Sequence, residues 1–376
     1  MKQLYVILSA LFILSCSGKN IADAEPVKKV TFPGFTTDFS NITVPLKEIF
    51  SGGPSKDGIP AIDKPLFISV SESDNKLQDS EPVIVFSLNM ETKIYPIRIL
   101  IWHEIVNDRV GTIPVAVTYC PLCNTGIVFK SRLDGKDLDF GTTGRLRFSN
   151  LIMYDRQSET WWQQATGEGI AGKYAVRTLE MLPSLHLSWK DAKLRYPEAL
   201  VLSEETGWNR PYGTNPYREY DTGEPFLFTG KKPAETADNL RLLDRVMLVT
   251  HNGATRLVSY KQLREENLVQ FSLNDRSIVV LWSSGTASAL DNSNIGQGRN
   301  VGAANAFYAY NGNKKLTFSA GERGFTDEKT GSSWDISGFS TKGPLAGENL
   351  EPATAIQHFW FSAAAFSEEN LTPVDF

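Results

Sequence analysis

Two cysteines, Cys120 and Cys123, are separated by two residues in the stretch VTYCPLCNTG (117–126). Disulfides, redox-active dithiols and half of a metal site all use this spacing. In redox dithiols of the thioredoxin kind, the first cysteine sits at a helix N-terminus, whose dipole stabilises the thiolate. Here Asn124-Thr125-Gly126 and then an apolar run follow, which predicts a turn into a strand. This context favours a metal knuckle, in which backbone N–H groups point at the sulfurs.

Further ligands are needed, because a structural zinc site takes four. His103, on a helix expected over 95–108, is the first candidate, and Met153 in NLIMYDRQ is the second. The competing interpretations are a hydrogen-bonded histidine and a methionine in a strand core. Two thiolates, an imidazole and a thioether suit Cu(I) better than magnesium or calcium. The expected metal is therefore copper or zinc.

Two alternatives use the same cysteine pair. One is a thiol–disulfide oxidoreductase, which cycles Cys120 and Cys123 between dithiol and disulfide. The other is a non-catalytic scaffold on the cell surface, in which a Cys120–Cys123 disulfide closes a tight turn. The sequence singles out no catalytic residue, and His186, His251 and His358 are interpreted as structural.

The N-terminus has the form of an export signal. Lys2 precedes an apolar run, Leu4 to Leu14, that is too short to span a bilayer and ends at Ser15-Cys16. Residues 1–16 are expected to be a lipoprotein signal with the lipid on Cys16, and residues 17–40 a tether. The membrane is then a partner, and the location is the cell envelope, on the outer membrane or periplasmic side where a cell has two membranes. This compartment is oxidising, so an idle cysteine pair can close into a disulfide.

The composition limits the classes of function. The chain has 376 residues, 41% of them hydrophobic, with a net charge of −5. A nucleic-acid partner is not expected, because phosphate binding needs a basic surface. The glycine-rich stretch SGGPSKDGIPAID (51–63) lacks the G-K-[ST] ending of a phosphate loop, so no nucleotide cofactor is expected either. It is interpreted as a lid or edge, in which Asp57 and Asp63 either orient a ligand or are exposed.

The pattern predicts an α+β fold that is mostly β, built from two degenerate repeats of one module with few short helices. The first module is 41–207, an irregular connection covers 208–240, and the second module is 241–376. The repeats are supported by residues that coincide when the two halves are matched, namely Asn89 with Asn252, Leu100 with Leu263, Asp155 with Asp327 and Trp162 with Trp334.

The second copy lacks the candidate chemistry. It has no cysteine opposite Cys120 or Cys123, and Arg264, Glu265 or Glu266 falls opposite His103. One copy of a duplicated module can keep chemistry while the other keeps only the scaffold, so the first copy is where a site is expected. The pair Trp161-Trp162 follows Asp155. Since Asp155 and Trp162 have counterparts in the second copy, a repeated turn over a buried indole is favoured over the stacking of a ligand on the tryptophans.

Several blocks together resemble a family of exported bacterial proteins catalogued as domain of unknown function 3179. They are SGGPSKDGIPAID, IYPIRILIWHEIVND, PVAVTYCPLCNTGIVF, LIMYDRQSETWWQ and TGSSWDISGFSTKGPLAG, and the resemblance runs from about Glu48 to Phe366. It implies an exported or lipid-anchored protein without a settled activity and names neither metal nor substrate. The leading hypothesis is an exported, lipid-anchored protein that binds a soft transition metal through Cys120, Cys123 and His103, with Met153 as a weaker ligand.

Overall fold

Strands make up most of the protein. The computed structural model describes residues 30–226, 239–321, 324–367 and 372–373. Short hairpins build several small sheets, and the helices have seven residues or fewer, so the expected α+β, mostly β fold is confirmed. The predicted signal with Cys16, and the predicted tether up to residue 29, lie outside the described residues.

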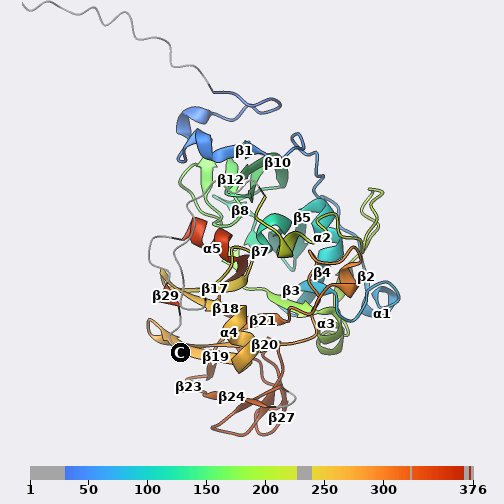
Figure 1. Ribbon diagram of the computed structural model, residues 1–376, viewed down its shortest axis with the longest axis vertical. Helices are drawn as coiled ribbons and strands as arrows, with labels where there is room; N and C mark the ends of the chain where they lie inside the picture. The colour runs from blue at the N-terminus through green and yellow to red at the C-terminus, as the bar shows by residue number, and fades with distance from the viewer. Residues whose placement is uncertain (1–29, 227–238, 322–323, 368–371, 374–376) are drawn as a thin grey trace, which may run out of the picture.

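One end of the molecule is an antiparallel sheet in the order β1-β10-β11-β12-β13, at the top of Figure 1. Phe32, Phe35 and Phe39, from the last part of the predicted tether, pack around Trp161 of this sheet. These residues are therefore part of the folded body, because the aromatic side chains bury one another. The elements here are η2 (Phe39–Asn41), η3 (Leu46–Glu48), β1 (Ile49–Ser51), β10 (Phe140–Arg147), β11 (Asn150–Asp155), β12 (Trp161–Gln163) and β13 (Gly169–Ala171).

The next sheet carries the two cysteines and has the order β14-β7-β6-β5. Its strands are almost entirely buried, which explains their continuous apolar runs. The elements are β5 (Ile105–Val110), β6 (Ile113–Cys120), η4 (Pro121–Cys123), β7 (Thr125–Lys130) and β14 (Met181–Leu182), with the small hairpin β8 (Arg132–Leu133) and β9 (Lys136–Asp137).

A third sheet, in the order β15-β3-β4-β16-β2, completes the first half and carries three helices. Helices α1 and α3 begin at Ser69 and Ser188, whose hydroxyls accept a backbone N–H of the first turn. The elements are β2 (Phe67–Ser69), α1 (Val70–Ser73), β3 (Pro82–Leu88), β4 (Glu91–Pro96), α2 (Ile97–His103), β15 (Leu185–Ser188), α3 (Trp189–Arg195) and β16 (Leu200–Leu202).

The second half lies at the other end of the long axis (Figure 1). Its sheets have the orders β28-β17-β18-β29, β19-β20-β21, β22-β23 and β24-β25-β26-β27. The connection before it contains η5 (Tyr220–Thr222). The elements of the second half are β17 (Arg245–His251), β18 (Ala254–Ser259), α4 (Tyr260–Glu266), β19 (Leu268–Leu273), β20 (Arg276–Ser283), η6 (Ile295–Gln297), β21 (Ala303–Tyr308), β22 (Tyr310–Asn311), β23 (Lys314–Lys315), β24 (Phe318–Gly321), β25 (Gly324–Asp327), β26 (Ser333–Trp334), β27 (Ser340–Lys342), β28 (Ala355–Phe359), α5 (Trp360–Phe366) and β29 (Thr372–Pro373).

The two halves share a core. One buried cluster joins Val83 and Trp189 of the first half to Phe307 and Trp334 of the second. Burial of apolar surface on this scale is the main stabilising term in folding. Among the described residues, no helix has the length and apolar character needed to cross a membrane.

The matched residues of the two halves have matching surroundings. The indole Nε1 of Trp162 donates to Asp155 Oδ2 at 2.9 Å, and that of Trp334 donates to Asp327 Oδ2 at 3.0 Å. Both indoles are buried, so the expected structural turn over a buried indole is confirmed. The duplication itself stays a prediction.

The helix expected over 95–108 is shorter than predicted. It ends at His103, and Glu104 adopts a left-handed conformation with φ of 58°. Residues Ile105–Val110 then form strand β5, paired with β6. The sequence pattern was misleading because Ile105 is buried on a strand but also continues the helical spacing of Ile101.

Candidate functional site

The Cys-Pro-Leu-Cys segment is a tight turn between two strands, as the sequence predicts. Strand β6 ends at Cys120, the single 3-10 turn η4 follows, and β7 begins at Thr125. Pro121 fixes the backbone at the start of the turn, and Asn124 closes it with φ of 50°, a conformation that asparagine tolerates better than most residues. Both cysteines are free thiols, with exposed fractions of 1% and 0%.

The surroundings keep the Cys120 thiol protonated. Burial, followed by the neighbouring Cys123 thiol, raises the pKa of Cys120 well above its usual range. The backbone N–H groups of Leu151 and Cys123 act in the opposite direction, because they face the sulfur. The sulfur also lies 3.8 Å from the carbonyl oxygen of Ser149, to which the thiol donates.

Glu104 is a buried carboxylic acid beside this thiol. Its exposed fraction is 7%. Burial raises the pKa of Glu104 well above the usual range, and the adjacent Cys120 raises it further. The raised pKa favours the neutral form of the carboxyl group, which can donate a hydrogen bond or a proton.

The backbone of Glu104 has an equivalent in the second half, but its side chain does not. Glu104 N–H donates to Leu100 O at 2.7 Å, and its carbonyl accepts from Tyr119 N–H at 2.8 Å. Asn267, with φ of 62°, makes the same two contacts with Leu263 and Trp282, both at 2.8 Å. A left-handed glutamate is less favourable than a left-handed asparagine.

This register also matches Cys120, which follows Tyr119, with Ser283, which follows Trp282. The first half therefore has an acid and a thiol where the second has an amide and a hydroxyl. A backbone conformation that is unfavourable for the residue present is a reason to look for a functional role.

An apolar cavity of about 300 Å³ opens in front of Glu104. Leu122, between the two cysteines in the chain, and Leu151, whose backbone N–H faces the Cys120 sulfur, form part of its wall. The predicted lid at 51–63 forms another part, held on β10 by Gly52 N–H to Gly144 O at 2.9 Å. The lining residues are Gly52, Pro54, Ile59, Glu104, Leu122, Thr142, Gly144, Arg145, Leu146, Leu151, Tyr217, Tyr220 and Phe226.

Two tyrosines from the irregular connection complete the wall. Burial raises the pKa of Tyr217, and the proximity of Glu104 and then Cys120 raises it further. Burial and Cys123 do the same for the pKa of Tyr220. The Tyr220 hydroxyl donates to the carbonyl oxygen of Leu122, inside the cysteine turn, at 2.9 Å. Glu104 and Tyr217 thus lie close together at the cavity wall, while the Tyr220 hydroxyl binds the cysteine turn.

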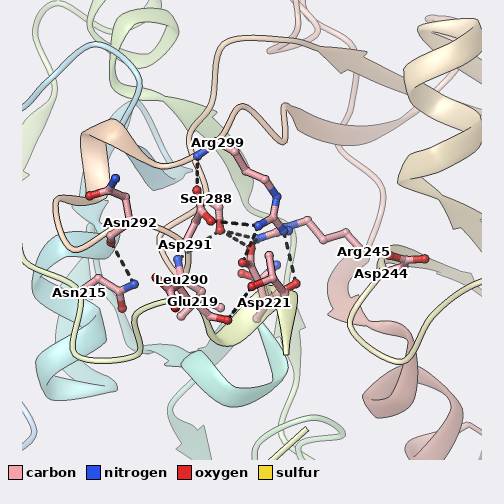
Figure 2. Close-up of polar contacts among 12 residues, drawn as sticks. Asn215, Glu219, Asp221, Asp244, Arg245, Ser288, Leu290, Asp291, Asn292 and Arg299 are labelled. Atoms are coloured by element: carbon pink, nitrogen blue, oxygen red, sulfur yellow. Dashed lines mark hydrogen bonds and ion pairs between the residues drawn. The ribbon is translucent and has the colours of Figure 1, made fainter. Parts of the chain in front are cut away.

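A buried ion-pair network fixes the tyrosine segment in place. Asp221, directly after Tyr220, is buried and contacts Arg245 and Arg299, each at 2.8 Å. Burial alone would raise the pKa of Asp221, but Arg245, Ser288 and Arg299 together hold it below its usual value. Figure 2 shows both arginines converging on Asp221 from the second half. Since Tyr220 immediately precedes Asp221 in the chain, this network also positions Tyr220 over the cysteine turn.

The predicted ligands His103 and Met153 both have other contacts in the structure, and their binding of a metal together with the cysteines stays a prediction. His103 is buried and lies 2.7 Å from Pro60 O through Nδ1 and 2.7 Å from the Tyr212 hydroxyl through Nε2. A carbonyl can only accept, so Nδ1 carries the proton and Nε2 accepts from the tyrosine. Burial lowers the pKa of His103, and Met153 lies in the core on β11. No group of three or more His, Cys, Asp or Glu side chains that could hold a metal occurs in the described parts of the chain.

The remaining predicted ligand-contacting groups are engaged by the protein. Trp161 is covered by the phenylalanines of residues 32–39, so the stacking interpretation is wrong for it. Asp63 accepts from Asn107 at 2.8 Å and pairs with Arg156. Asp57 accepts from the Tyr154 hydroxyl.

Sequence reasoning missed Glu104, Tyr217 and Tyr220. The one available signal for Glu104 was its place in the block HEIVND beside His103. The tyrosines carry no local signal, because their position depends on contacts of Asp221 with Arg245 and Arg299, far along the chain.

Comparison with known proteins places most of the chain in one family. A family model described as "Protein of unknown function (DUF3179)" matches residues 56–370. Searches of curated proteins and of solved structures each found no match.

Proposed function

Since the chain belongs to the DUF3179 family, whose description names no activity, we propose a function from the site itself. The protein is a thiol-dependent oxidoreductase that reduces a small molecule bound in the apolar cavity. Cys120 and Cys123 supply the two electrons and become a disulfide. The observation that carries the proposal is a dithiol beside a buried acid, Glu104, which lines the wall of an apolar cavity.

The acid has a defined task in this chemistry. When a dithiol reduces a substrate, the bond that breaks leaves a basic atom, which needs a proton. A carboxyl group that stays protonated at pH 7 can supply that proton, and an ordinary exposed glutamate cannot. Glu104 recovers the proton from the thiol that becomes oxidised, so the acid is unchanged after the reaction.

A purely structural pair of cysteines accounts for less of the site. A disulfide across so short a loop constrains the unfolded chain weakly, so it adds little stability. It also gives no reason for a glutamate in a left-handed conformation where the second half has Asn267. The redox proposal accounts for both the pair and the acid.

Soft-metal binding by the same pair is the second candidate. The backbone N–H groups of Leu151 and Cys123 that face the Cys120 sulfur favour a thiolate, the form that binds metal. Cu(I) suits two thiolates, whereas zinc wants four ligands, and His103 would have to give up the hydrogen bond of the ring nitrogen that binds the metal. Copper is therefore the metal to test first.

We further propose that the protein is exported and held at a membrane by lipid on Cys16. The support is the sequence of residues 1–16. A diacyl anchor carries more than one chain, which is enough for stable attachment.

The test of the redox proposal is to trap a covalent intermediate. Reduced wild-type protein and the Cys123→Ser and Cys120→Ser variants are each mixed with hydroxyethyl disulfide and analysed as intact proteins by mass spectrometry. We expect an internal disulfide in the wild type and a stable mixed disulfide in one of the two variants. Neither product after prolonged incubation would contradict the proposal. The copper content of the same reduced samples then tests the second candidate. Metal binding requires one copper per chain in the wild type and none in either serine variant.

A further inference from the structure

The inference concerns the substrate, and it rests on the redox function proposed above. We propose that the cavity accepts a small sulfoxide with apolar substituents, which the protein reduces to the thioether. Glu104 donates to the sulfoxide oxygen, and the cysteine pair supplies the electrons.

The distribution of apolar and polar groups on the cavity wall matches that of a small sulfoxide. Most of the lining is apolar and includes Ile59, Leu122, Leu146 and Leu151. Against this background stand the Glu104 carboxyl group and the Tyr217 hydroxyl, whereas the Tyr220 hydroxyl already donates to Leu122 O. A dialkyl sulfoxide has two apolar arms and one strongly accepting oxygen. A simple disulfide has no comparable acceptor and would leave the acid without a partner.

The charge of the site argues against a strongly anionic substrate. Arg145 is the only lysine or arginine among the lining residues of this cavity. Its guanidinium carbon lies 5.2 Å from the centre of the Phe32 ring, over which it makes a cation–π contact. Burial and then the neighbouring Cys120 raise the pKa of Glu104, so a negative charge next to this side chain is disfavoured. A doubly charged ligand would lose its hydration without gaining a matched set of donors.

The reaction balances with the groups present. Glu104 protonates the sulfoxide oxygen, a cysteine sulfur attacks the sulfoxide sulfur, and the sulfur–oxygen bond breaks; the oxygen leaves as water with the proton from Glu104 and the proton of the attacking thiol, and the substrate sulfur is joined to the cysteine as a thiosulfonium. The second cysteine then attacks the first, the bond to the substrate sulfur breaks and releases the thioether, and the proton of the second thiol returns to Glu104. In total, one sulfoxide and two thiols give one thioether, one disulfide and one water. The substrate sulfur gains two electrons, and the cysteine pair loses two.

Access to the sulfurs runs through Leu122. This side chain lies between the two cysteines in the turn and lines the cavity, while the thiols themselves are buried. Displacement of Leu122 by the substrate brings the sulfoxide sulfur to the thiols. The contact between the Tyr220 hydroxyl and Leu122 O holds the turn backbone while the side chain moves.

The experiment is a single turnover without added reductant. The full folded chain is reduced, freed of dithiothreitol and mixed with methyl p-tolyl sulfoxide at pH 7. The sulfide is measured by chromatography and the Cys120–Cys123 disulfide by mass spectrometry. We expect one sulfide per disulfide formed, and a rate about 100-fold lower in Glu104→Gln, the size of a general-acid contribution. Glu265→Gln, which removes an exposed carboxyl group on α4, is the matched control and should react at the wild-type rate.

The outcomes separate the substrate from the function. If hydroxyethyl disulfide oxidises the cysteine pair but the sulfoxide yields no sulfide, the substrate inference is overturned and the redox function stands. If neither compound oxidises the pair, both are overturned. A Glu104→Gln rate equal to the wild-type rate also overturns the inference, because the acid is then not used. Glu104→Asn, which copies the left-handed Asn267, provides a second acid-free variant should the glutamine fail to fold.

Discussion

The buried acid makes the stability of this protein depend on pH in a way that one substitution can isolate. The folded state keeps Glu104 protonated, because burial and Cys120 raise its pKa well above the usual range. In the unfolded chain the same side chain ionises near its ordinary pKa of 4.5. As the pH rises above that value, the unfolded state loses a proton that the folded state retains. The folded state is therefore destabilised as the pH rises through this window.

The size of the effect follows from the number of protons involved. One proton gives a slope of about 1.4 kcal/mol per pH unit in the free energy of unfolding. The slope begins near pH 4.5 and continues until the pH reaches the raised pKa of the folded state. Glu104→Gln keeps the shape of the neutral acid and has no proton to lose. The stability of the variant relative to wild type should then increase with pH by up to about 1.4 kcal/mol per unit.

The assay is urea unfolding of both proteins between pH 4.5 and 8 in reducing buffer. The difference between the two free energies of unfolding removes the contributions of all other titrating groups. We expect a difference that grows steadily in favour of Glu104→Gln, and no such trend for the exposed control Glu265→Gln. A difference that stays constant over the whole range would refute the reasoning, because Glu104 would then ionise equally in both states.

Three further predictions concern the second half, the ion-pair network at Asp221 and the N-terminus. Asn267→Glu places in the second half the residue type that the first half has at Glu104. Because glutamate is less favourable than asparagine in a left-handed conformation, the free energy of unfolding, measured with urea, should fall by about 1 kcal/mol. An unchanged value would contradict the strain argument. Asp221→Asn should lower the free energy of unfolding by about 3 kcal/mol, because it leaves the buried Arg245 without its carboxylate partner. Arg241→Ala, at an exposed pair, should cost less than about 1 kcal/mol; equal costs would mean that Asp221 does not anchor the connection. Cys16→Ser should move the protein from the detergent phase to the aqueous phase in a detergent partition of whole cells, and an unchanged partition would contradict lipidation at Cys16.

Local patterns predicted the parts of the molecule that depend on neighbours in the chain. The turn between β6 and β7 follows from Pro121 and Asn124, and the Asp155–Trp162 contact follows from a spacing that recurs at Asp327 and Trp334. The end of α2 was missed, because Ile105 fits both a helical spacing and a buried strand. Whether an apolar residue belongs to a helix or a strand is decided by the partner strand, here β6.

The site depends on contacts that no local pattern carries. Glu104, Leu122 and Tyr220 meet only because β5 and β6 pair and because Asp221 is held by Arg245 and Arg299. His103 was the more conspicuous residue by type, but its ring is fully engaged by Pro60 and Tyr212. The residue after it, with an ordinary side chain in an unusual backbone conformation, faces the cavity instead.

The central claim is that two adjacent sulfurs exchange electrons reversibly, and an equilibrium redox titration tests it most directly. The full chain is incubated at pH 7 in graded ratios of reduced to oxidised dithiothreitol, alkylated, and analysed for the Cys120–Cys123 disulfide by mass spectrometry. The account predicts one two-electron transition, reached from both the oxidised and the reduced starting material. A pair that stays reduced, or stays oxidised, across the whole range of ratios would contradict it.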